Sequence, residues 1–345
     1  MTTNFWKDLP KPFFALAPMA DVTDAAFRRI IAKYSKWGGQ DVIDREGKFT
    51  RPKATAVGGP DVMWTEFVSA DGLVLAPEAG KKKILKDLEY SESERPIVAQ
   101  LFGSRPENME KAAALCASLG FDGVDINMGC PDKTIEKQKA GAAMIKNPEL
   151  AREVILAAKR GAPHLPISVK TRLGYNKDEI ETWLPHLLSC DLAAVVIHAR
   201  TRKEMSSVPA RWERIKRAVE IRDASGKDTL IIGNGDVEDL ESGKLKVEET
   251  GCDGVMLGRG IFGNPWLFSG LHQRSDLKEC LNVLIEHTKL FEELLGGIKN
   301  FSIMKKHYKA YVDGFSSAKE LRMKLMEAKN AREVESIVQD FIKAI

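Results

Sequence analysis

The chain has 345 residues, which is enough for one large domain with a small second domain, or for two mid-sized domains. Hydrophobic residues make up 43% of it and charged residues 29%, as is ordinary for soluble globular proteins. The formal net charge of +3, from 52 basic and 49 acidic residues, permits a nucleic-acid partner without indicating one, because nucleic-acid-binding domains usually carry a strong basic charge.

The cysteines and histidines give no framework for disulfides or metal. The five cysteines are odd in number and no two form a Cys-x-x-Cys pair, so a disulfide framework or a zinc knuckle is not expected. The six histidines are scattered without a His-x-x-x-His pair, so we expect no metal site. Residues 1–10 lack a signal-peptide core and no 18 apolar residues run together, so we expect a cytoplasmic protein with no membrane partner.

Short apolar runs alternate with longer amphipathic runs for most of the chain. In chain order the pattern predicts a strand at Phe13–Met19, a helix at Asp24–Tyr34, strands at Val62–Phe67 and Pro96–Leu101, a helix at Pro106–Leu119, a strand at Gly123–Asn127, a helix at Pro148–Arg160, a strand at Ile167–Lys170, a helix at Lys177–Ser189, a strand at Ala193–His198, a helix at Arg211–Asp223, a strand at Thr229–Gly233, a helix at Val237–Thr250 and a last strand at Gly254–Leu257. Helical spacing alone follows, at Ser275–Leu295, Ser302–Val312 and Ser316–Ile345.

This order predicts an α/β fold, a (β/α)8 TIM barrel followed by a small all-helical C-terminal domain. The strands are apolar without clean alternation, which is typical of a parallel sheet buried on both faces. An open doubly wound sheet is the alternative, but the Gly-x-Gly-x-x-Gly turn that it usually carries after its first strand is missing here. We therefore expect a barrel at 1–271 and a helical domain at 272–345, with a long polar loop at Ser35–Pro60.

In a barrel of this kind the active site lies at the carboxyl ends of the strands. The polar or glycine residues predicted there, with the residues that end the first strand, are Ala17, Pro18, Met19, Gln100, Asn127, Cys130, Lys170, Arg172, His198, Arg200, Arg202, Asn234, Gly235, Asp236, Gly258 and Arg259. The turns Gly233–Asp236 and Gly258–Gly260 follow the seventh and eighth predicted strands, where such barrels commonly bind phosphate. Each turn alone is as well explained as a strand cap, so the phosphate prediction depends on the two occurring together.

Cys130 is the most informative single residue. Most cysteines are small buried hydrophobes, and the other four, Cys116, Cys190, Cys252 and Cys280, fit that description. Cys130 instead follows a buried strand, on a loop between Gly129 and Pro131, where a side chain can reach a substrate.

Taken together, these motifs resemble the tRNA-dihydrouridine synthase family. The matching stretches are DINMGCPDKTI at Asp125–Ile135, AGA at Ala140–Ala142, APM at Ala17–Met19, VKTR at Val169–Arg172, HARTR at His198–Arg202, GNGD at Gly233–Asp236, GRG at Gly258–Gly260 and NPW at Asn264–Trp266. Lys305–His307, Tyr311 and Leu321–Arg322 match the family's helical domain. The chain departs from the family at Ser35–Pro60, where the connection is longer, and at Ala199, where many members carry glycine.

The resemblance implies an oxidoreductase that acts on a CH–CH bond, with FMN as cofactor, NADPH or NADH as reductant, and tRNA as substrate and partner. It implies flavin contacts from Ala17, Pro18, Met19, Gln100 and Lys170, and phosphate contacts from Asn234, Gly235, Asp236, Gly258 and Arg259, with His198 nearby. Asn127 and Arg172 are expected at the uracil edge, and Arg200 and Arg202 at the RNA. Further RNA contacts are expected from Lys203, Lys305, Lys306, Lys309, Lys319, Arg322 and Lys324, although a solvated surface charge is the usual role of such residues.

Reduction of the uracil C5=C6 bond is a conjugate addition, in which hydride goes to C6 and a proton to C5. A thiol with an ordinary pKa of about 8.5 is largely protonated at neutral pH, so Cys130 is expected to be the acid. Attack by a Cys130 thiolate on C6 is the alternative, and it needs a nearby base that the sequence does not offer.

Two other readings stay open at this point. A dihydroorotate or dihydropyrimidine dehydrogenase also handles a pyrimidine C5=C6 bond with FMN and a cysteine, but lacks a basic helical domain of this kind. An RNA-binding folding factor with dispensable catalysis is the third possibility. The sequence does not choose the uridine position, NADPH over NADH, or the role of Ser35–Pro60, and a monomer is the expected state.

Overall fold

A computed structural model describes residues 4–39, 58–270 and 276–345. These residues divide into two compact units. The first, the barrel unit, takes the described residues of Met1–Met19, Pro60–Glu89 and Arg95–Gly258. The second, the helical unit, takes those of Ala20–Gly59, Tyr90–Glu94 and Arg259–Ile345.

The barrel unit is built on one parallel sheet that curls round to meet itself. Its strands are β1 (Phe13–Leu16), β2 (Met63–Trp64), β3 (Val68–Ser69), β4 (Ile97–Phe102), β5 (Gly123–Met128), β6 (Ile167–Arg172), β7 (Ala194–His198), β8 (Leu230–Asn234) and β9 (Gly254–Leu257). They follow the order β1-β9-β8-β7-β6-β5-β4-β2, and β3 pairs with the far end of β4. Two hydrogen bonds join the ends of the ring, Leu16 N to Val62 O at 3.1 Å and Asp61 N to Phe14 O at 2.8 Å. The predicted TIM barrel is confirmed.

The second barrel strand, predicted at Val62–Phe67, is split into β2 and β3. The interruption has a local cause at Thr65. The Gln100 N–H donates to the side-chain Oγ1 of Thr65 at 3.0 Å, where a regular ladder would use a backbone carbonyl. Strands β2 and β3 both pair with β4 and together occupy one strand position, so the barrel has eight strand positions.

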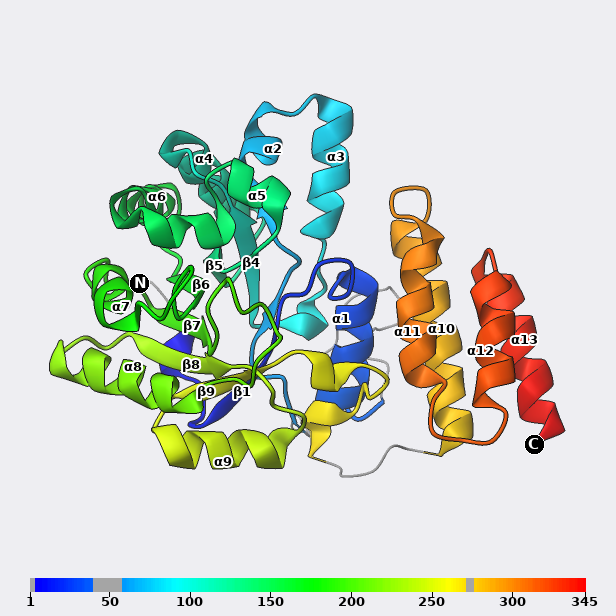
Figure 1. Cartoon of the computed structure of the whole chain (residues 1–345). Coiled ribbons are helices and arrows are strands. Elements are labelled where there is room, and N and C mark those ends of the chain that lie inside the picture. Colours follow the sequence, from blue (N-terminus) through cyan, green and yellow to red (C-terminus); the bar gives the residue numbers. More distant parts are fainter. Residues whose placement is uncertain (1–3, 40–57, 271–275) are drawn as a thin grey trace. The chain divides into compact units, whose positions relative to one another are not determined.

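Helices cover the outside of this sheet, as Figure 1 shows for α4, α6, α7, α8 and α9. The helices of the barrel unit are η1 (Phe5–Lys7), α2 (Ala70–Leu75), α3 (Glu78–Asp87), α4 (Pro106–Ser118), α5 (Lys133–Lys137), η4 (Gly141–Lys146), α6 (Pro148–Gly161), α7 (Ile180–Leu188), α8 (Trp212–Ala224) and α9 (Leu240–Thr250). The five on the outside were predicted. The sequence pattern missed α2, α3, α5 and η4, since α2 and α5 are too short for a helical period and α3 buries no residue.

Local sequence sets where these helices begin and end. Asn147 accepts a hydrogen bond from the Leu150 N–H and Pro148 occupies the first turn, so α6 begins there. Asp239 and Ser242 form a reciprocal capping box at the start of α9, and Gly251 ends that helix with a φ of 71°. A left-handed φ of this kind favours glycine over any residue with a Cβ.

The helical unit contains α1 (Ala25–Ile31), η2 (Ala32–Lys36, a π-helix), η3 (Glu92–Glu94), η5 (Arg259–Ile261), η6 (Leu267–Ser269), α10 (Leu277–Leu295), η7 (Phe301–Ile303), α11 (Met304–Tyr311), α12 (Ala318–Glu327) and α13 (Ala331–Ala344). The single helical stretch predicted at Ser316–Ile345 is two helices, because Ala328 leaves the helical conformation and Asn330 caps α13 through the Glu333 N–H.

Helix α1 belongs to this unit and not to the barrel unit. Ala26 and Ile30 of α1 are buried in one apolar cluster with Leu281 and Leu284 of α10. In this division α1 is grouped with the C-terminal helices, because it buries its apolar side against helices that lie far along the chain. The domain limits stay a prediction, since residues 271–275, where the boundary was expected, lie outside the described residues.

Most of the Ser35–Pro60 loop, residues 40–57, also lies outside the described part of the chain. Within the helical unit, Arg28 and Glu94 form a fully buried ion pair, with Arg28 Nε donating to Glu94 Oε2 at 2.7 Å. Arg28 Nη1 also donates to the Thr23 carbonyl at 2.7 Å, and the Ser91 N–H donates to Glu94 Oε1 at 2.8 Å. The pair thus ties α1 to the 90–94 segment of the same unit. Among the helices described here, none is long and apolar enough to cross a membrane.

Candidate active site

The predicted site residues lie on the interior face of the barrel strands. The apolar cluster inside the barrel includes Val98, Val196, Ile232 and Met256, one from each of β4, β7, β8 and β9. Because side chains alternate along a strand, the residues two positions later on those strands face the same interior. On β4, β7 and β8 these are Gln100, His198 and Asn234, all from the predicted set, and Gly258 follows the end of β9. The interior is therefore apolar along β4, β7, β8 and β9 until their carboxyl ends, where it becomes polar.

The strand register brings the polar groups to one level. Arg172 of β6 pairs with His198 of β7, which pairs in turn with Asn234 of β8. Lys170 lies two residues before Arg172, and its Nζ donates to Asn234 Oδ1 at 3.0 Å. The Asn234 Nδ2 donates to the Met256 carbonyl at 2.8 Å, so this amide bridges β6 and β9. The carboxyl rim thus holds three basic side chains from adjacent strands.

Two basic side chains of the rim, Lys170 and Arg172, have lowered pKa values. Burial and, to a smaller extent, the neighbouring Arg172 charge lower the pKa of Lys170 to about 8, against an opposing effect of Asp125. Burial likewise lowers the pKa of Arg172 to about 10. A bound anion would favour the charged forms of both groups, so the rim is suited to an anionic ligand.

His198, Arg200 and Asp236 form a second cluster on the loops after β7 and β8. Arg200 is almost fully buried, and its Nη2 forms an ion pair with Asp236 while its Nη1 lies 3.0 Å from His198 Nε2. A guanidinium can only donate, so His198 Nε2 must accept and the ring proton belongs on Nδ1. Gly235, between the two loops, has a φ of 130°, which a residue with a Cβ would not readily adopt.

The Cys130 loop is held in place by its own strand and by β6. Asn127 Oδ1 accepts from the backbone N–H groups of Gly129 at 3.1 Å and Cys130 at 2.9 Å. Arg172 Nε donates to the Gly129 carbonyl at 2.8 Å, and the Ala142 N–H donates to the Cys130 carbonyl at 2.9 Å. The loop conformation is therefore fixed by four hydrogen bonds on both sides of the thiol.

Cys130 is half-buried, whereas the other four cysteines are buried. Burial raises the pKa of the Cys130 thiol above its ordinary value, and the Arg172 charge opposes that rise. At neutral pH the side chain is a thiol, which can donate a proton but is a weak nucleophile.

Several predicted site residues have partners that limit what else they can bind. Arg172 Nη1 donates to the carbonyls of Thr201 at 3.1 Å and Met205 at 3.0 Å, so most of this guanidinium holds loops together. Arg202 forms an ion pair with Glu136 of α5. Gln100 is fully buried and bonds to Asp125 and Asn127.

The remaining predicted residues lie at the ends of the ring. Ala17 is buried and its N–H donates to the Leu257 carbonyl at 2.8 Å, while Pro18 and Met19 are half-buried. A Cβ at Gly258 would meet Ala17 Cβ at 3.7 Å, so Gly258 lies beside the end of β1. Arg259 was predicted to act with Gly258, and it falls in η5 of the helical unit.

Two interior residues received no role from the sequence, Asp125 of β5 and Ser168 of β6. Their side chains bond to one another at 2.6 Å, and Asp125 also bonds to Gln100. The available signal was a carboxylate inside the apolar run Gly123–Asn127. Within the described residues, no group of three or more potential metal ligands comes together.

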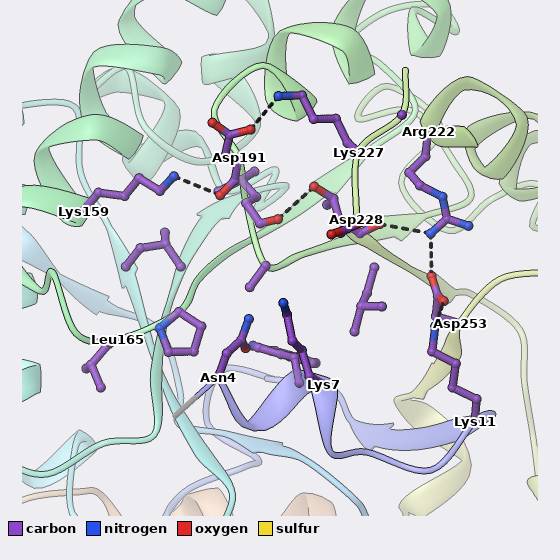
Figure 2. A pocket seen from close by; sticks show the side chains of 18 of the residues that line it. Asn4, Lys7, Lys11, Lys159, Leu165, Asp191, Arg222, Lys227, Asp228 and Asp253 are labelled. Atoms are coloured by element: carbon purple, nitrogen blue, oxygen red, sulfur yellow. Dashed lines mark hydrogen bonds and ion pairs between the residues drawn. The ribbon is translucent and has the colours of Figure 1, made fainter. Parts of the chain in front are cut away.

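A pocket of about 890 Å³ opens at the opposite, amino-terminal ends of the strands. Figure 2 shows Asn4, Lys7 and Lys11 facing it from the first residues of the chain. Charges around it are paired with one another, Lys227 with Asp191 at 2.6 Å and Arg222 with Asp253 at 2.8 Å. In TIM barrels this end contributes to stability, and the observed pairs join the loops before the strands to one another and to α8, so the catalytic residues are sought at the other rim.

Comparison with known proteins now decides the family. The family model Dihydrouridine synthase (Dus) matches residues 15–345. The chain belongs to the dihydrouridine synthase family. Dihydrouridine synthases are oxidoreductases that act on CH–CH bonds, so this chain is an enzyme of that class. The resemblance read from the rim motifs is confirmed.

Individual relatives cover the whole chain. "Probable tRNA-dihydrouridine synthase 2" of Bacillus subtilis (strain 168) is 40% identical over 343 residues, which cover 99% of this chain and 97% of that protein. "Probable tRNA-dihydrouridine synthase" of Staphylococcus aureus (strain MRSA252) is 39% identical, over 99% and 96%. Among solved structures, a morphinone reductase complex with tetrahydroNAD matches with a TM-score of 0.47 and 15% identity over 76% of this chain and 87% of that one. A likeness of that size carries no inference about chemistry.

Proposed function

We propose that this dihydrouridine synthase reduces the C5=C6 bond of a uridine in tRNA, with FMN as its cofactor and NADPH as the reductant. The relatives that match 99% of the chain are described as tRNA-dihydrouridine synthases, which supports the substrate. The observation that carries the mechanism is a half-buried cysteine, Cys130, on a loop that hydrogen bonds fix at the carboxyl rim of a barrel.

The rim residues fit a flavin mononucleotide. Lys170 and Arg172 are cations with lowered pKa values, as expected of groups that await negative charge. Lys170, Gln100 and the Ala17–Met19 backbone would hold the ring system. Asn234, Gly235 and Asp236, with His198 and Gly258, would hold the phosphate. When bound, FMN supplies a hydride.

Cys130 is assigned as the acid. Addition of hydride at C6 leaves the electron pair of the broken double bond at C5, and the Cys130 S–H proton goes to that carbon. The thiolate that remains lies near the Arg172 charge, which favours it electrostatically, and it is reprotonated from solvent. A raised thiol pKa suits a donor that must stay protonated until the carbanion forms.

The contacts to RNA divide into two groups. At the rim, Asn127 and Arg172 remain the candidates for the uracil edge, while Arg200 and Arg202 are held by Asp236 and Glu136 and shape the loops as well. In the helical unit, Lys309, Lys319 and Lys324 line one hollow of about 690 Å³ together with Arg322. Lysine side chains gathered at such a hollow suit the phosphates of an RNA backbone.

The test is dihydrouridine formation in tRNA that lacks the modification, with purified flavin-loaded protein and NADPH. The wild type should form dihydrouridine, and Cys130→Ala should lower the rate about a hundredfold, as loss of a general acid does. Cys190→Ala removes a buried cysteine instead and should behave as the wild type. A protein that oxidises NADPH and leaves tRNA unchanged would contradict the substrate, and full activity of Cys130→Ala would contradict the acid.

A further inference from the structure

A buried carboxylate, Asp125, begins a chain of hydrogen bonds that ends at the catalytic loop. Asp125 is fully buried, and its register partners are Gln100 on β4 and Ser168 on β6. Its Oδ1 accepts from Ser168 Oγ at 2.6 Å, and its Oδ2 accepts from Gln100 Nε2 at 2.7 Å. Asp125 thus anchors one end of the Gln100 amide from inside the barrel.

The next two links follow from the chemistry of the groups. An ionised carboxylate only accepts hydrogen bonds, so Gln100 must turn its NH₂ to Asp125 and its Oε1 away. Asn127 Nδ2 donates to that Oε1 at 3.1 Å, which turns the Asn127 Oδ1 toward the loop. There Oδ1 accepts from the N–H groups of Gly129 and Cys130. Backbone N–H groups only donate, so both ends of the chain demand the same orientation of the two amides.

We propose that Asp125 is a positioning residue for catalysis, which fixes the orientation of Gln100 and Asn127 and thereby holds Cys130 over its substrate. This proposal rests on the proposed function, because the hydrogen-bond chain is taken to position Cys130 as the acid of that reaction. Asp125 and Cys130 are five positions apart in one strand and its loop, yet the connection runs through a neighbouring strand. The loop is therefore coupled to the interior of the barrel and not only to its own strand.

The charge state of Asp125 agrees with this role. Burial raises its pKa to about 6, while hydrogen bonds from Ser168 and Gln100 and the Lys170 charge oppose the rise. Above that pH the group is a carboxylate, which is the form that accepts from both neighbours.

The experiment measures the reactivity of Cys130 in the cofactor-free protein. Iodoacetamide alkylation is followed by mass spectrometry from pH 6 to 10, since the other four cysteines are buried. Asp125→Leu removes the carboxylate that accepts from Gln100 and keeps a side chain of similar size. Gln100→Met cuts the chain one link later and leaves Asp125 with Ser168, so it decides the question if the first variant does not fold. Both should be alkylated about fivefold faster, the effect of one lost hydrogen bond on loop opening, with the profile shifted to lower pH as the thiol becomes solvated.

Two matched variants separate positioning from general damage. Asp125→Asn still offers an oxygen to Gln100, with its NH₂ turned to the Ser168 hydroxyl, and should react close to wild type. Ser168→Ala touches the same carboxylate but leaves the chain to Cys130 whole, and should also match wild type. Alkylation of Asp125→Leu and Gln100→Met at the wild-type rate overturns the proposal, as does an Asp125→Asn that behaves like Asp125→Leu.

Turnover then separates this proposal from the proposed function. In the flavin-loaded enzymes, Asp125→Leu should slow dihydrouridine formation more than flavin reduction by NADPH. Only dihydrouridine formation uses the Cys130 proton. If Cys130→Ala keeps full activity, the acid assignment fails whatever the alkylation shows. If Cys130→Ala is inactive while both chain-cutting variants keep wild-type alkylation and turnover, the positioning role alone fails.

Discussion

Acid should destabilise the helical unit through two buried histidines. His287 of α10 and His307 of α11 are fully buried, with ring centroids 4.7 Å apart. Within the described residues neither Nε2 atom has a hydrogen-bond partner, and His287 Nδ1 makes one long contact of 3.4 Å with the Tyr311 hydroxyl. Phe27 packs on both rings. Nothing in this cluster offers negative charge to an imidazolium.

The size of the effect follows from linkage. Burial lowers the pKa of His287 to about 3, and burial with the neighbouring His287 and Lys306 charges lowers that of His307 well below its usual value. The unfolded chain takes up these protons near pH 6.5, so stability is full above that pH and falls as the pH drops below it. At pH 5 His287 alone should cost about 2 kcal/mol of the free energy of unfolding.

Urea unfolding monitored by hydrogen exchange of α10 and α11 peptides, at pH 7.5 and 5.0, measures this cost. His287→Phe replaces the ring with one that does not titrate, so its loss of stability between the two pH values should be about 2 kcal/mol smaller than that of the wild type. His164→Gln removes an exposed histidine and should keep the wild-type difference. Equal pH dependence in His287→Phe and the wild type would refute the reasoning.

Three further predictions concern the ion pair, the rim and the loop. Glu94→Gln removes the buried carboxylate charge that pairs with Arg28 and should cost about 3 kcal/mol in urea unfolding. FMN affinity, measured by fluorescence quenching, should fall up to about tenfold from pH 7 to pH 9, because the protonated form of Lys170 binds an anion better and its pKa is about 8. Gly141→Ala should slow dihydrouridine formation at least about tenfold, since Gly141 has a φ of 60° and a Cβ there would lie 2.8 Å from the Cys130 carbonyl oxygen.

Each of these has a matched control. Glu327→Gln, at an exposed position of α12 in the same unit, should leave urea unfolding unchanged. Lys170→Met should bind FMN weakly but with no step near pH 8. Gly226→Ala also has a positive φ, of 66°, with nothing within 4 Å of a new Cβ, so it should keep full activity. If Gly226→Ala were as slow as Gly141→Ala, crowding at Cys130 would not be the cause.

The strands and the rim could be predicted because both depend on local sequence. A buried parallel strand is a short apolar run, and the residues that follow it must lie at the carboxyl end of the barrel, so Lys170, His198 and Asn234 were identified without coordinates. The hydrogen bond between Lys170 and Asn234 could not be predicted, because it joins β6 and β8, which are not consecutive strands, and depends on their register.

The misses have the same origin. The division of the second strand depends on Thr65 Oγ1 accepting from Gln100, a contact between two strands. Helix α5 has five residues, too few to show a period. The place of α1 depends on packing against α10, which no local pattern encodes. Asp125 lies in a motif that the sequence analysis recognised. Its proposed role depends on how the side-chain amides of Gln100 and Asn127 are oriented, which the sequence does not show.

The interleaving of the two units bears on how the chain is made. The helical unit draws α1, η2 and the 90–94 segment from early in the sequence and its other helices from the end. During synthesis from the N-terminus, Ala26 and Ile30 leave the ribosome long before Leu281 and Leu284 exist to cover them. The apolar side of α1 must therefore remain uncovered by its native partners until almost the whole chain has been translated. Contacts that form this late between distant parts of the chain slow folding and expose nascent chains to aggregation. A fragment that stops before α10 should therefore fold poorly and bind chaperones.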